Sequence, residues 1–447
     1  MSYAAAVDKL NAMVPELVAQ PGRPRRKFSL DEIRVLLGEV GNPQETFRSV
    51  LISGTNGKGS TAATLASILT ESGVRTGLYT SPHLVRPNER IRVEGTEIAD
   101  ERFAADFFRV QEMGERLVRA GRLPQHPSYF EVLTAMAFLH FAAQGVTVAV
   151  LEVGMGGRLD ATNVVEPILS IITDISLDHM EWLGPTITVI AREKAGILRR
   201  GGTMITLPQH PEANQVLGET AMELGVKVVS AALFVPQAEL VPPAGAGAHG
   251  SYRVEVRGEE IEVDSPLKGS HQHRNLALAM AAAAELKSRY GFPISAGTIE
   301  AGIRKTSWPG RLERMEAGGM LWILDVAHNP AGAWALRAGV RAVLREDSPV
   351  TLIFSCLRDK PVAEMAQILF PLFNRVIVVP IHSARAAPLA DLMDAARAAG
   401  VRAEAAESAR EAIALAKTSG GTTVVAGSVY LVGEVRPLLM AEARDRL

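Results

Sequence analysis

The stretch FRSVLISGTNGKGSTAATL, residues 47–65, joins an apolar run to a glycine-rich loop and then to a helical pattern. Glycines in such a loop let backbone N–H groups approach phosphate oxygens, and the start of the following helix adds partial positive charge. Lys58 can neutralise phosphate, and the Ser60 hydroxyl can reach a divalent cation. The loop departs from the strict P-loop pattern, because Ile52 replaces the leading glycine and Gly59 separates Lys58 from Ser60. We predict a phosphate-binding loop; the alternative is an ordinary glycine-rich turn.

The composition restricts the class of protein. With 447 residues the chain is too long for a single core, which predicts two or three domains. A hydrophobic content of 47% and a charged content of 21% are typical of a soluble globular protein. The net charge of -2 gives no electrostatic reason to expect nucleic acid or a membrane as a partner. An anionic substrate therefore requires local positive charge or metal ions.

The setting predicted from the sequence is the cytoplasm. The single cysteine, Cys356, excludes an intramolecular disulfide and fits a reducing compartment. The N-terminal MSYAAAVDKLNAMV lacks the basic and long apolar regions of a signal peptide. No stretch reaches the ~18 apolar residues that a membrane-spanning helix needs.

The first part of the chain alternates apolar, β-branched runs with helical patterns, which predicts an α/β fold with a mainly parallel sheet. The expected strands are residues 49–53, 77–81, 146–153, 168–173 and 202–207. Two helices, residues 60–73 and 129–145, each end at a glycine. The segment 241–266 alternates like an antiparallel hairpin, and residues 273–291 form a further expected helix.

A second βα series follows TSWPGR, residues 306–311. Its expected strands are residues 320–326, 350–356, 374–381 and 422–428. We place the domain boundary between residues 305 and 311, which gives domains 1–306 and 307–447. Ligands of open α/β sheets collect at the carboxyl ends of the strands, where most of the polar residues discussed below lie.

Two residues at strand ends are candidate metal ligands. Glu152 ends an apolar run, where a carboxylate is costly unless it is paired or metal-bound; the alternative is a satisfied strand-end acid. His179 lies six residues beyond the 168–173 run, near Asp174 and Asp178. A lone histidine is more often structural than a ligand. A hydroxyl, a carboxylate and an imidazole at such loops could nevertheless complete a magnesium shell around a triphosphate.

Lys194 gives an independent indication. In TITVIAREKAGIL, residues 186–198, Ile187, Ile190, Ala191 and Lys194 recur at helical spacing, which places the lysine on the inward face. Burial lowers the pKa of a lysine, because desolvation disfavours the ammonium. A neutral amine can add carbon dioxide and become a carbamate anion. The alternative is a snorkelling stem that keeps its charge in water.

Three further polar residues have ordinary alternatives. Asn275 heads an alanine-rich pattern and could cap that helix. Arg311 follows Pro309 and Gly310 at the expected linker and could be a surface charge. Asp325 precedes HNP and could cap the helix that follows.

Ordered motifs along nearly the whole chain resemble one family. They are GTNGKGS (54–60), YTSPHLVRPNERI (79–91), SYFEVLTAMAF (128–138), LEVGMGGRLDATN (151–163), ITDISLDHMEWLG (172–184), AREKAGI (191–197), HQHRN (271–275), PGR (309–311), DVAHNP (325–330) and GSVYLVGE (427–434). The chain resembles the folylpolyglutamate synthases of the Mur ligase superfamily, including the bifunctional enzymes that are also dihydrofolate synthases. This resemblance implies a P-loop-containing Mur-ligase-type central α/β domain with a mainly parallel sheet, and a smaller Rossmann-like C-terminal α/β domain.

The resemblance also implies site residues, each by its match to a family motif. The implied ATP contacts are Gly54, Thr55, Asn56, Gly57, Lys58, Gly59, Ser60, Thr61, Asn275, Arg311 and Asp325. One magnesium is expected at Ser60, Ser81 and Glu152, and a second at Glu152 and His179. Lys58, a carboxylated Lys194 and His328 near the phosphates have the implied catalytic roles. The implied pterin contacts are Ser128, Tyr129, Phe130, Glu131, Leu159, Asp160 and Ala161.

The chain departs from the family pattern at three places. Ser128 stands where threonine is more common, and Met155 where leucine is common. Ala384-Arg385 replaces the usual Pro-Arg, so no role is assigned to Arg385. The N-terminal segment 25–44 resembles the family without assigned pterin contacts.

The activity that the resemblance implies is ATP-dependent ligation of L-glutamate to a folate or to dihydropteroate. ATP transfers its γ-phosphoryl group to the substrate carboxylate, and the glutamate amine attacks the acyl phosphate to form an amide. The expected protein is a monomer with small-molecule substrates only.

Two rival functions are weighed against this one. A Mur ligase with a UDP-linked substrate carries a UDP-binding domain before its nucleotide loop, but only 53 residues precede Gly54. A regulatory ATPase without ligase activity gives no reason for Glu152, His179 and an inward Lys194.

Overall fold

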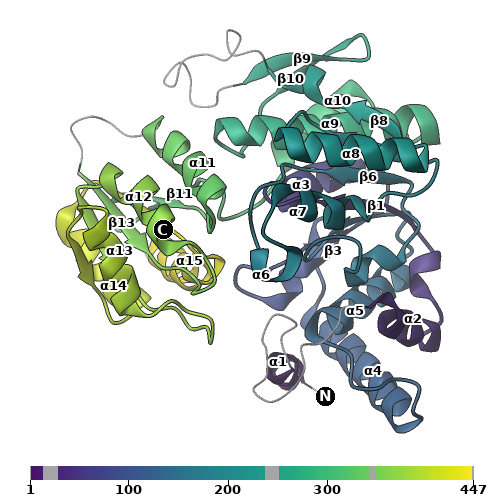
Figure 1. The fold of residues 1–447 in the computed structure, drawn as a ribbon, viewed down its shortest axis with the longest axis horizontal. Helices are drawn as coiled ribbons and strands as arrows, with labels where there is room; N and C mark the ends of the chain where they lie inside the picture. Colours follow the sequence, from purple (N-terminus) through teal and green to yellow (C-terminus); the bar gives the residue numbers. More distant parts are fainter. Residues whose placement is uncertain (1, 14–28, 237–250, 343–348, 445–447) are drawn as a thin grey trace. The chain divides into compact units, whose positions relative to one another are not determined.

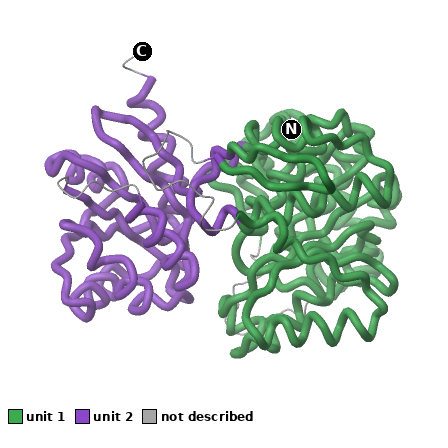
Figure 2. Tube along the Cα trace, turned by 90° about the horizontal axis from the view of Figure 1, so that it is seen from above, with its two compact units in different colours: residues 1–240, 252–264, 274–306 green, residues 241–251, 265–273, 307–447 purple. Residues whose placement is uncertain are grey.

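The computed structural model describes residues 2–13, 29–236, 251–342 and 349–444. The chain forms two compact units (Figure 2). The larger unit contains residues 1–240, 252–264 and 274–306, and the smaller contains residues 241–251, 265–273 and 307–447. Each unit is built around its own sheet.

The larger unit contains an 8-stranded sheet in the order β4-β3-β2-β5-β1-β6-β7-β8. All pairs from β2 to β8 are parallel, whereas β3 and β4 pair antiparallel at one edge. The mainly parallel sheet predicted from the sequence is therefore confirmed. The strands are β1 (Arg48–Ser53), β2 (Thr76–Tyr79), β3 (Ile91–Val93), β4 (Thr96–Glu97), β5 (Val148–Glu152), β6 (Leu169–Ile172), β7 (Thr203–Thr206) and β8 (Lys227–Ser230).

The helices of the larger unit pack in pairs as well as on the sheet (Figure 1): α10 contacts α3, and α4 contacts both α1 and α5. Their bounds are α1 (Tyr3–Ala12), α2 (Leu30–Glu39), α3 (Lys58–Glu71), α4 (Asp100–Arg119), α5 (Tyr129–Ala143), α6 (Met180–Leu183), α7 (Ile187–Ala195), α8 (Pro211–Leu224), α9 (Ser270–Tyr290) and α10 (Ala296–Lys305). A two-stranded antiparallel hairpin, β9 (Tyr252–Val256) and β10 (Glu259–Val263), confirms the expected alternation there. Residues 241–250 of that segment lie outside the described residues.

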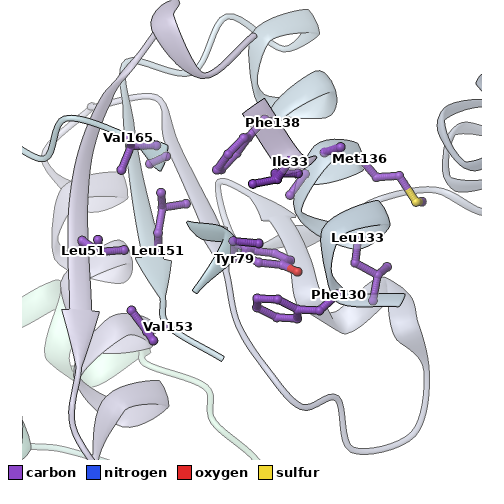
Figure 3. Close-up of a cluster of buried hydrophobic side chains, with 14 of the residues drawn as sticks. Ile33, Leu51, Tyr79, Phe130, Leu133, Met136, Phe138, Leu151, Val153 and Val165 are labelled. Atoms are coloured by element: carbon purple, nitrogen blue, oxygen red, sulfur yellow. The ribbon is translucent and has the colours of Figure 1, made fainter. Parts of the chain in front are cut away.

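The core of the larger unit explains why α5 has no polar face. A helix that is apolar all round is stable in water only when it is buried. Phe130, Leu133 and Met136 of α5 pack in one cluster with Leu51 and Leu151 of two neighbouring strands (Figure 3). This packing fixes the start of α5 against the sheet, and with it the segment that carries Ser128 to Glu131.

The smaller unit contains a 6-stranded sheet in the order β11-β12-β16-β13-β14-β15. Only β11 is antiparallel to its neighbour. The four strands expected from the sequence are present, with β11 and β15 in addition. The elements are β11 (Glu313–Ala317), β12 (Met320–Leu324), α11 (Pro330–Arg341), β13 (Val350–Phe354), α12 (Val362–Leu369), β14 (Arg375–Val378), α13 (Leu389–Ala398), β15 (Ala403–Ala405), α14 (Ala409–Ser419), β16 (Thr422–Ala426) and α15 (Val429–Arg444).

Two helices begin earlier than the sequence predicts. The first, α3, begins at Lys58 directly after Gly57, and α9 begins at Ser270 rather than at residue 273. Asn275 therefore lies inside α9, and the interpretation of Asn275 as its cap is wrong. Among the described residues no helix is long and apolar enough to cross a membrane.

Candidate active site

The glycine-rich loop after β1 has the shape that a phosphate site needs. Gly57 has φ +91° and directly precedes α3, whose first N–H groups lack partners within the helix. A Cβ on Gly57 would lie 2.1 Å from Asn275 Oδ1, and one on Gly54 would lie 1.8 Å from Thr173 Oγ1. The backbone here therefore approaches its neighbours more closely than any side chain allows.

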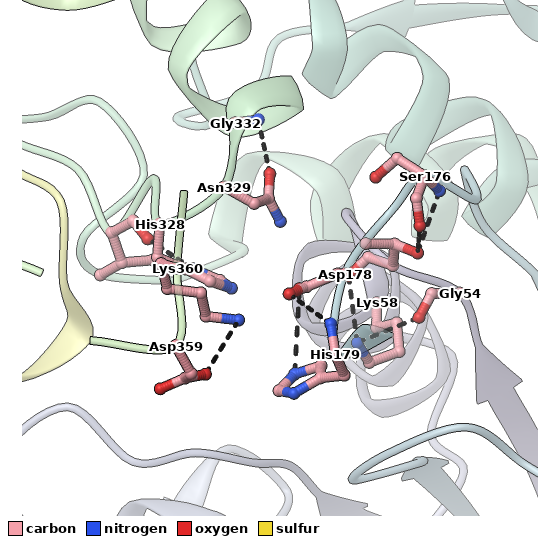
Figure 4. Close-up of polar contacts among 12 residues, drawn as sticks. Gly54, Lys58, Ser176, Asp178, His179, His328, Asn329, Gly332, Asp359 and Lys360 are labelled. Atoms are coloured by element: carbon pink, nitrogen blue, oxygen red, sulfur yellow. Dashed lines mark hydrogen bonds and ion pairs between the residues drawn. The ribbon is translucent and has the colours of Figure 1, made fainter. Parts of the chain in front are cut away.

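Hydrogen bonds hold this loop in place. The backbone N–H groups of Thr55 and Asn56 donate to the Asp174 carbonyl at 2.8 and 3.2 Å. Lys58 Nζ donates to the carbonyls of Gly54 and Thr55, both at 3.2 Å (Figure 4). The ammonium group of Lys58 therefore lies over the loop, on the side where a bound phosphate would contact it.

The Gly57 geometry predicts the effect of a single methyl group. Gly57→Ala should raise the Kd of ATP about tenfold or more, because the added Cβ displaces Asn275 and distorts the loop. Gly73→Ala is the matched control, since Gly73 has φ +73° but open space within 4 Å. Both variants carry the same kind of backbone strain of roughly 1–2 kcal/mol. Titration of an ATP analogue checks this; equal affinities for the two variants would contradict it.

Three of the four predicted metal ligands lie at the carboxyl ends of adjacent parallel strands. Glu152 ends β5 and is 4% exposed, and its Oε2 accepts a hydrogen bond from the Ser81 N–H at 3.1 Å. Ser81 follows β2, which pairs with β5, and the buried Ser60 lies in α3 directly after the loop that follows β1. Hydroxyl and carboxylate oxygens are hard ligands of the kind that magnesium prefers. The donor set present therefore fits this ion.

His179 follows β6, on the other side of β1. Its backbone is left-handed, with φ 50°, and its N–H donates to Asp178 Oδ1 at 2.9 Å. The His179 ring Nε2 lies 3.8 Å from Asp178 Oδ2 (Figure 4). Within the described ranges no group of three or more His, Cys, Asp or Glu side chains could hold a metal. A cation here would need hydroxyl or phosphate oxygens to complete its shell.

Lys194 is buried, as the helical spacing predicts. Its side chain is on the inward face of α7, and Nζ donates to the Gly54 carbonyl at 2.6 Å. Burial, followed by the nearby charge of Lys58, lowers the pKa of Lys194 to about 7, while Asp178 and Asp160 act in the opposite direction. The snorkelling alternative is therefore wrong, and a substantial fraction of the amine is neutral at neutral pH.

A cavity of about 150 Å³ lies next to these residues in the larger unit. Phe130 and Glu131, together with Leu159, Asp160 and Ala161, line it, so residues from both predicted pterin segments meet at one pocket. Several further lining residues were not among the predicted contacts: Ser29, Glu32, Arg158, Trp182, Leu183 and Glu193. Arg158, Glu193, Trp182 and Leu183 stand in quoted family motifs, and Ser29 and Glu32 in the family-like segment 25–44, but no motif assigned them to a pocket. Residues 25–28 of that segment lie outside the described part.

The other two predicted pterin residues have structural roles. Ser128 caps α5: its Oγ accepts from the Glu131 N–H at 3.2 Å, and Glu131 Oε2 accepts from the Ser128 N–H at 2.7 Å. The guanidinium of Arg90 lies 5.3 Å from the centre of the Tyr129 ring. Neither Ser128 nor Tyr129 lines the cavity.

Asp160 closes the loop that forms one wall of the cavity. Its Oδ2 accepts from the Met155 N–H at 2.9 Å, and its Oδ1 accepts from the N–H and the hydroxyl of Thr162 at 3.0 and 2.6 Å. Burial raises the pKa of Asp160 in spite of these hydrogen bonds. The buried Asp160 carboxyl group therefore holds the backbone of this wall in place through its hydrogen bonds to Met155 and Thr162.

Asp325, in the smaller unit, is buried and does not cap a helix. Its Oδ2 accepts from the Leu312 N–H and its Oδ1 from the Ala327 N–H, both at 2.8 Å. The cap of α11 is Asn329, whose Oδ1 accepts from the Gly332 N–H at 2.8 Å (Figure 4). The capping interpretation of Asp325 is wrong, because α11 begins four residues after the position that Asp325 could cap.

The remaining predicted residues of the smaller unit lie on neighbouring segments. The ring Nδ1 of His328 is 2.8 Å from the Val326 carbonyl, and Arg311 Nη1 donates to the Gly310 carbonyl at 3.0 Å. The Val326 N–H donates to the same Gly310 carbonyl at 3.0 Å. Arg311 and His328 are therefore held on adjacent strand-end loops of one sheet.

Basic residues also follow β13 and β14 of that sheet. Lys360 is 7% exposed and its Nζ is 4.0 Å from Asp359 Oδ2 (Figure 4). Arg385 Nη2 donates to the same carboxylate at 2.7 Å. The Ala384-Arg385 departure from the family pattern thus keeps the guanidinium on the loop.

Comparison with known proteins defines the class first. Residues 52–283 match the Mur ligase middle domain, and residues 310–429 match the Mur ligase, glutamate ligase domain. The chain therefore belongs to the Mur ligase family, in agreement with a glycine-rich loop and an adjacent cavity on one parallel sheet.

Full-length relatives define the family within that class. The chain is 34% identical to the dihydrofolate synthase/folylpolyglutamate synthase of Bacillus subtilis, over 92% of this chain and 95% of that protein. It is also 34% identical to the folylpolyglutamate synthase of Lacticaseibacillus casei, over 98% and 99%. The Mycobacterium tuberculosis folylpolyglutamate synthase complexed with ADP and AMPPCP superposes with a TM-score of 0.87 at 32% identity, covering 98% and 99% of the two chains. The chain belongs to the folylpolyglutamate synthase/dihydrofolate synthase family.

Proposed function

We propose that this protein joins L-glutamate to a folate-type carboxylate, using ATP to form an acyl phosphate. The substrates are tetrahydrofolate, which becomes polyglutamylated, and dihydropteroate, which becomes dihydrofolate. Relatives that carry both names, and an Escherichia coli FolC structure in complex with DHPP and ADP at 27% identity, support both reactions.

One observation carries the proposal. Strand β5 delivers Glu152 to the side of the nucleotide loop, and the residues that follow it, 155–161, form a wall of the cavity. The Ser53 hydroxyl, directly before the nucleotide loop, donates to the Gly156 carbonyl in that wall at 2.6 Å. This connection supports the proposal, because a carboxylate substrate in the cavity would then lie beside a triphosphate bound at the loop.

The proposed reaction has two steps. A carboxylate oxygen forms a bond to the γ-phosphorus of ATP. The bond between the γ-phosphorus and the β–γ bridging oxygen breaks, which releases ADP. The glutamate nitrogen then bonds to the acyl carbon and loses a proton, and phosphate leaves. The first step brings two anions together, so Lys58 and the loop N–H groups must stabilise charge there.

We further propose that the protein uses two magnesium ions. Ser60, Ser81 and Glu152 would hold one, and Glu152 and His179 the other. Magnesium supplies positive charge beside the transferring phosphoryl group. The support is the donor set: a buried hydroxyl, a buried carboxylate and an imidazole at three neighbouring strand ends.

We also propose that Lys194 is carboxylated. Its neutral amine bonds to the carbon of carbon dioxide and loses one proton, which turns a buried cation into an anion. The pKa of about 7, caused by burial and by Lys58, supports this, because an ordinary lysine is almost never neutral at pH 7.

We assign residues 1–306 to an ATP-binding domain and residues 307–447 to a glutamate-ligase domain, and the matched ranges 52–283 and 310–429 support this division. Asn275, Arg311, Asp325 and His328 would contribute to the ATP site. We also propose that the protein is a monomer. The buried, single Cys356 suits a reducing cytoplasm.

The incoming glutamate requires cationic partners, and we place its carboxylates at Lys360 and Arg385 at the strand ends of the smaller unit. Lys360→Met should raise the KM for glutamate about tenfold or more and leave the KM for ATP within about threefold. Lys417→Met is the control, since Lys417 pairs with Glu442 elsewhere in the same unit. Steady-state kinetics check this; an unchanged KM for glutamate would remove Lys360 from the site.

The proposed function is tested with purified protein, Mg-ATP and glutamate, offered dihydropteroate and tetrahydrofolate in separate reactions. Mass spectrometry should find a product heavier by one glutamyl residue in each case, together with ADP and phosphate in equal amounts. ATP hydrolysis that does not depend on glutamate, with no new amide product, would support the regulatory ATPase instead.

A further inference from the structure

The wall of the cavity and the last turn of α7 are in unusually close contact. A Cβ on Gly157 would lie 2.8 Å from the Glu193 carbonyl oxygen and 2.9 Å from that of Lys194. A Cβ on Gly196 would lie 2.3 Å from Arg158 Cβ. Glycine at both positions lets the two backbones meet, so a shift of one segment must move the other.

Polar bonds add to this contact. The Arg158 N–H donates to the Glu193 carbonyl at 2.8 Å, and Arg158 Nε and Nη2 both donate to Glu193 Oε1, at 3.1 and 2.9 Å. Asn163 Nδ2 donates to the carbonyls of Arg158 and Gly196, both at 3.1 Å. Arg158 and Glu193 both line the cavity, so their ion pair is part of the surface that a substrate meets.

The same helix reaches the nucleotide loop one residue later. Lys194 Nζ donates to the Gly54 carbonyl at 2.6 Å, and Ser53 Oγ donates to the Gly156 carbonyl at 2.6 Å. The contacts therefore form a closed ring: cavity wall, Glu193, Lys194, nucleotide loop and back to the wall. The Arg158–Glu193 pair is the member of this ring that lies open to the cavity.

We infer that Arg158 and Glu193 are positioning residues that hold Lys194 and the nucleotide loop in register with the substrate in the cavity. The inference rests on the proposed function, in which the cavity takes the pterin part of the substrate. The side chains of the pair are 56% and 26% exposed, and pairs of that kind contribute little to stability. Their effect is therefore expected in turnover rather than in folding.

The test uses the full-length protein with Mg-ATP, glutamate and dihydropteroate. We expect Glu193→Gln and Arg158→Gln each to lower kcat about tenfold, with the KM for ATP within about threefold of the parent value. The kcat of the double variant should lie within about twofold of the kcat of either single variant, because the two side chains act as one unit. Glu193→Asp, which keeps the charge, should recover part of the loss, and unfolding temperatures should stay unchanged.

Glu94→Gln is the matched control, since the Arg75–Glu94 pair is 3.1 Å long and 43% and 45% exposed, away from the cavity. It should leave kcat unchanged. A kcat for Glu193→Gln within about twofold of the parent, or additive losses in the double variant, would overturn the inference. If the parent protein is inactive with both pterin substrates, the proposed function itself is refuted. The failure of the inference and the failure of the proposed function are therefore distinguishable.

Discussion

Lys58→Ala and Glu152→Ala each abolish ATP-dependent glutamate ligation while the protein stays folded. We expect product formation to fall about 10³-fold or more, because each change removes charge stabilisation where two anions must meet. Folding should survive. Lys58 Nζ donates to two carbonyls of its own loop, and removing Glu152 takes away a buried carboxylate. Product assays and thermal unfolding, measured on the same preparations, check both halves of this expectation.

A control variant shows whether the loss of any lysine charge, rather than the loss of this site, lowers turnover. Lys305→Ala removes a lysine that pairs with Glu71 at 2.8 Å on the surface, and it should leave turnover unchanged. Near-normal turnover in purified Lys58→Ala or Glu152→Ala would contradict their assignment, and with it the location of the triphosphate.

Lys194→Met should abolish turnover and at the same time stabilise the protein. The pKa of the Lys194 amine is about 7 in the folded protein and 10.5 in the unfolded chain, so burying this amine lowers the free energy of unfolding. The destabilisation is complete below pH 7 and decreases as the pH rises from 7 to 10.5. Methionine has a similar volume and carries no charge. In bicarbonate-free buffer at pH 6.5 we expect a gain of about 1–2 kcal/mol, since loss of the Lys194–Gly54 hydrogen bond offsets part of the relief.

Thermal unfolding at pH 6.5 and pH 9 checks this prediction. The stabilisation should shrink at the higher pH, because the parent lysine is then neutral in the folded protein. Lys287→Met is the control, as this lysine pairs with Glu259 on the surface. A variant that is less stable than the parent at pH 6.5, or one that keeps its turnover, would contradict the role of the buried amine.

The fold was predictable where burial dictates the sequence. The central strands of both sheets are buried on both faces and read as apolar runs, so they were placed to within about two residues. Strand β8 was missed because it is at the sheet edge and mostly exposed, and β15 because it has only 3 residues. Edge strands of this kind carry no strong hydrophobic pattern.

The site was predictable where its chemistry is local. The glycine loop and the inward Lys194 are each contained in one continuous segment, and local spacing identifies them. The cavity is different: Glu32 reaches it from α2, Ser29 from the N-cap of that helix, and Trp182 from α6. Only tertiary packing brings these segments to the loop at 154–161. Arg158 and Glu193 each stand in a family motif, but the motifs are 35 residues apart and nothing in them shows that the two side chains pair.

The misread positions share one cause. In the sequence, Asn275 and Asp325 are candidate helix caps because each stands near an expected helix start. In the structure α9 begins at Ser270, and Asn329 takes the cap of α11. Helix starts are fixed by tertiary contacts as much as by the local pattern, so a polar residue near an expected start is weak support for a cap.

Isotope transfer reports most directly on whether ATP energises the acid group to which glutamate is joined. Dihydropteroate labelled with ¹⁸O in both carboxylate oxygens is turned over with Mg-ATP and glutamate, and the inorganic phosphate is analysed by mass spectrometry. An acyl phosphate predicts one ¹⁸O atom in every phosphate released, and one left in the amide. Unlabelled phosphate, released at the same rate as the amide product, would contradict activation of the carboxylate by phosphoryl transfer.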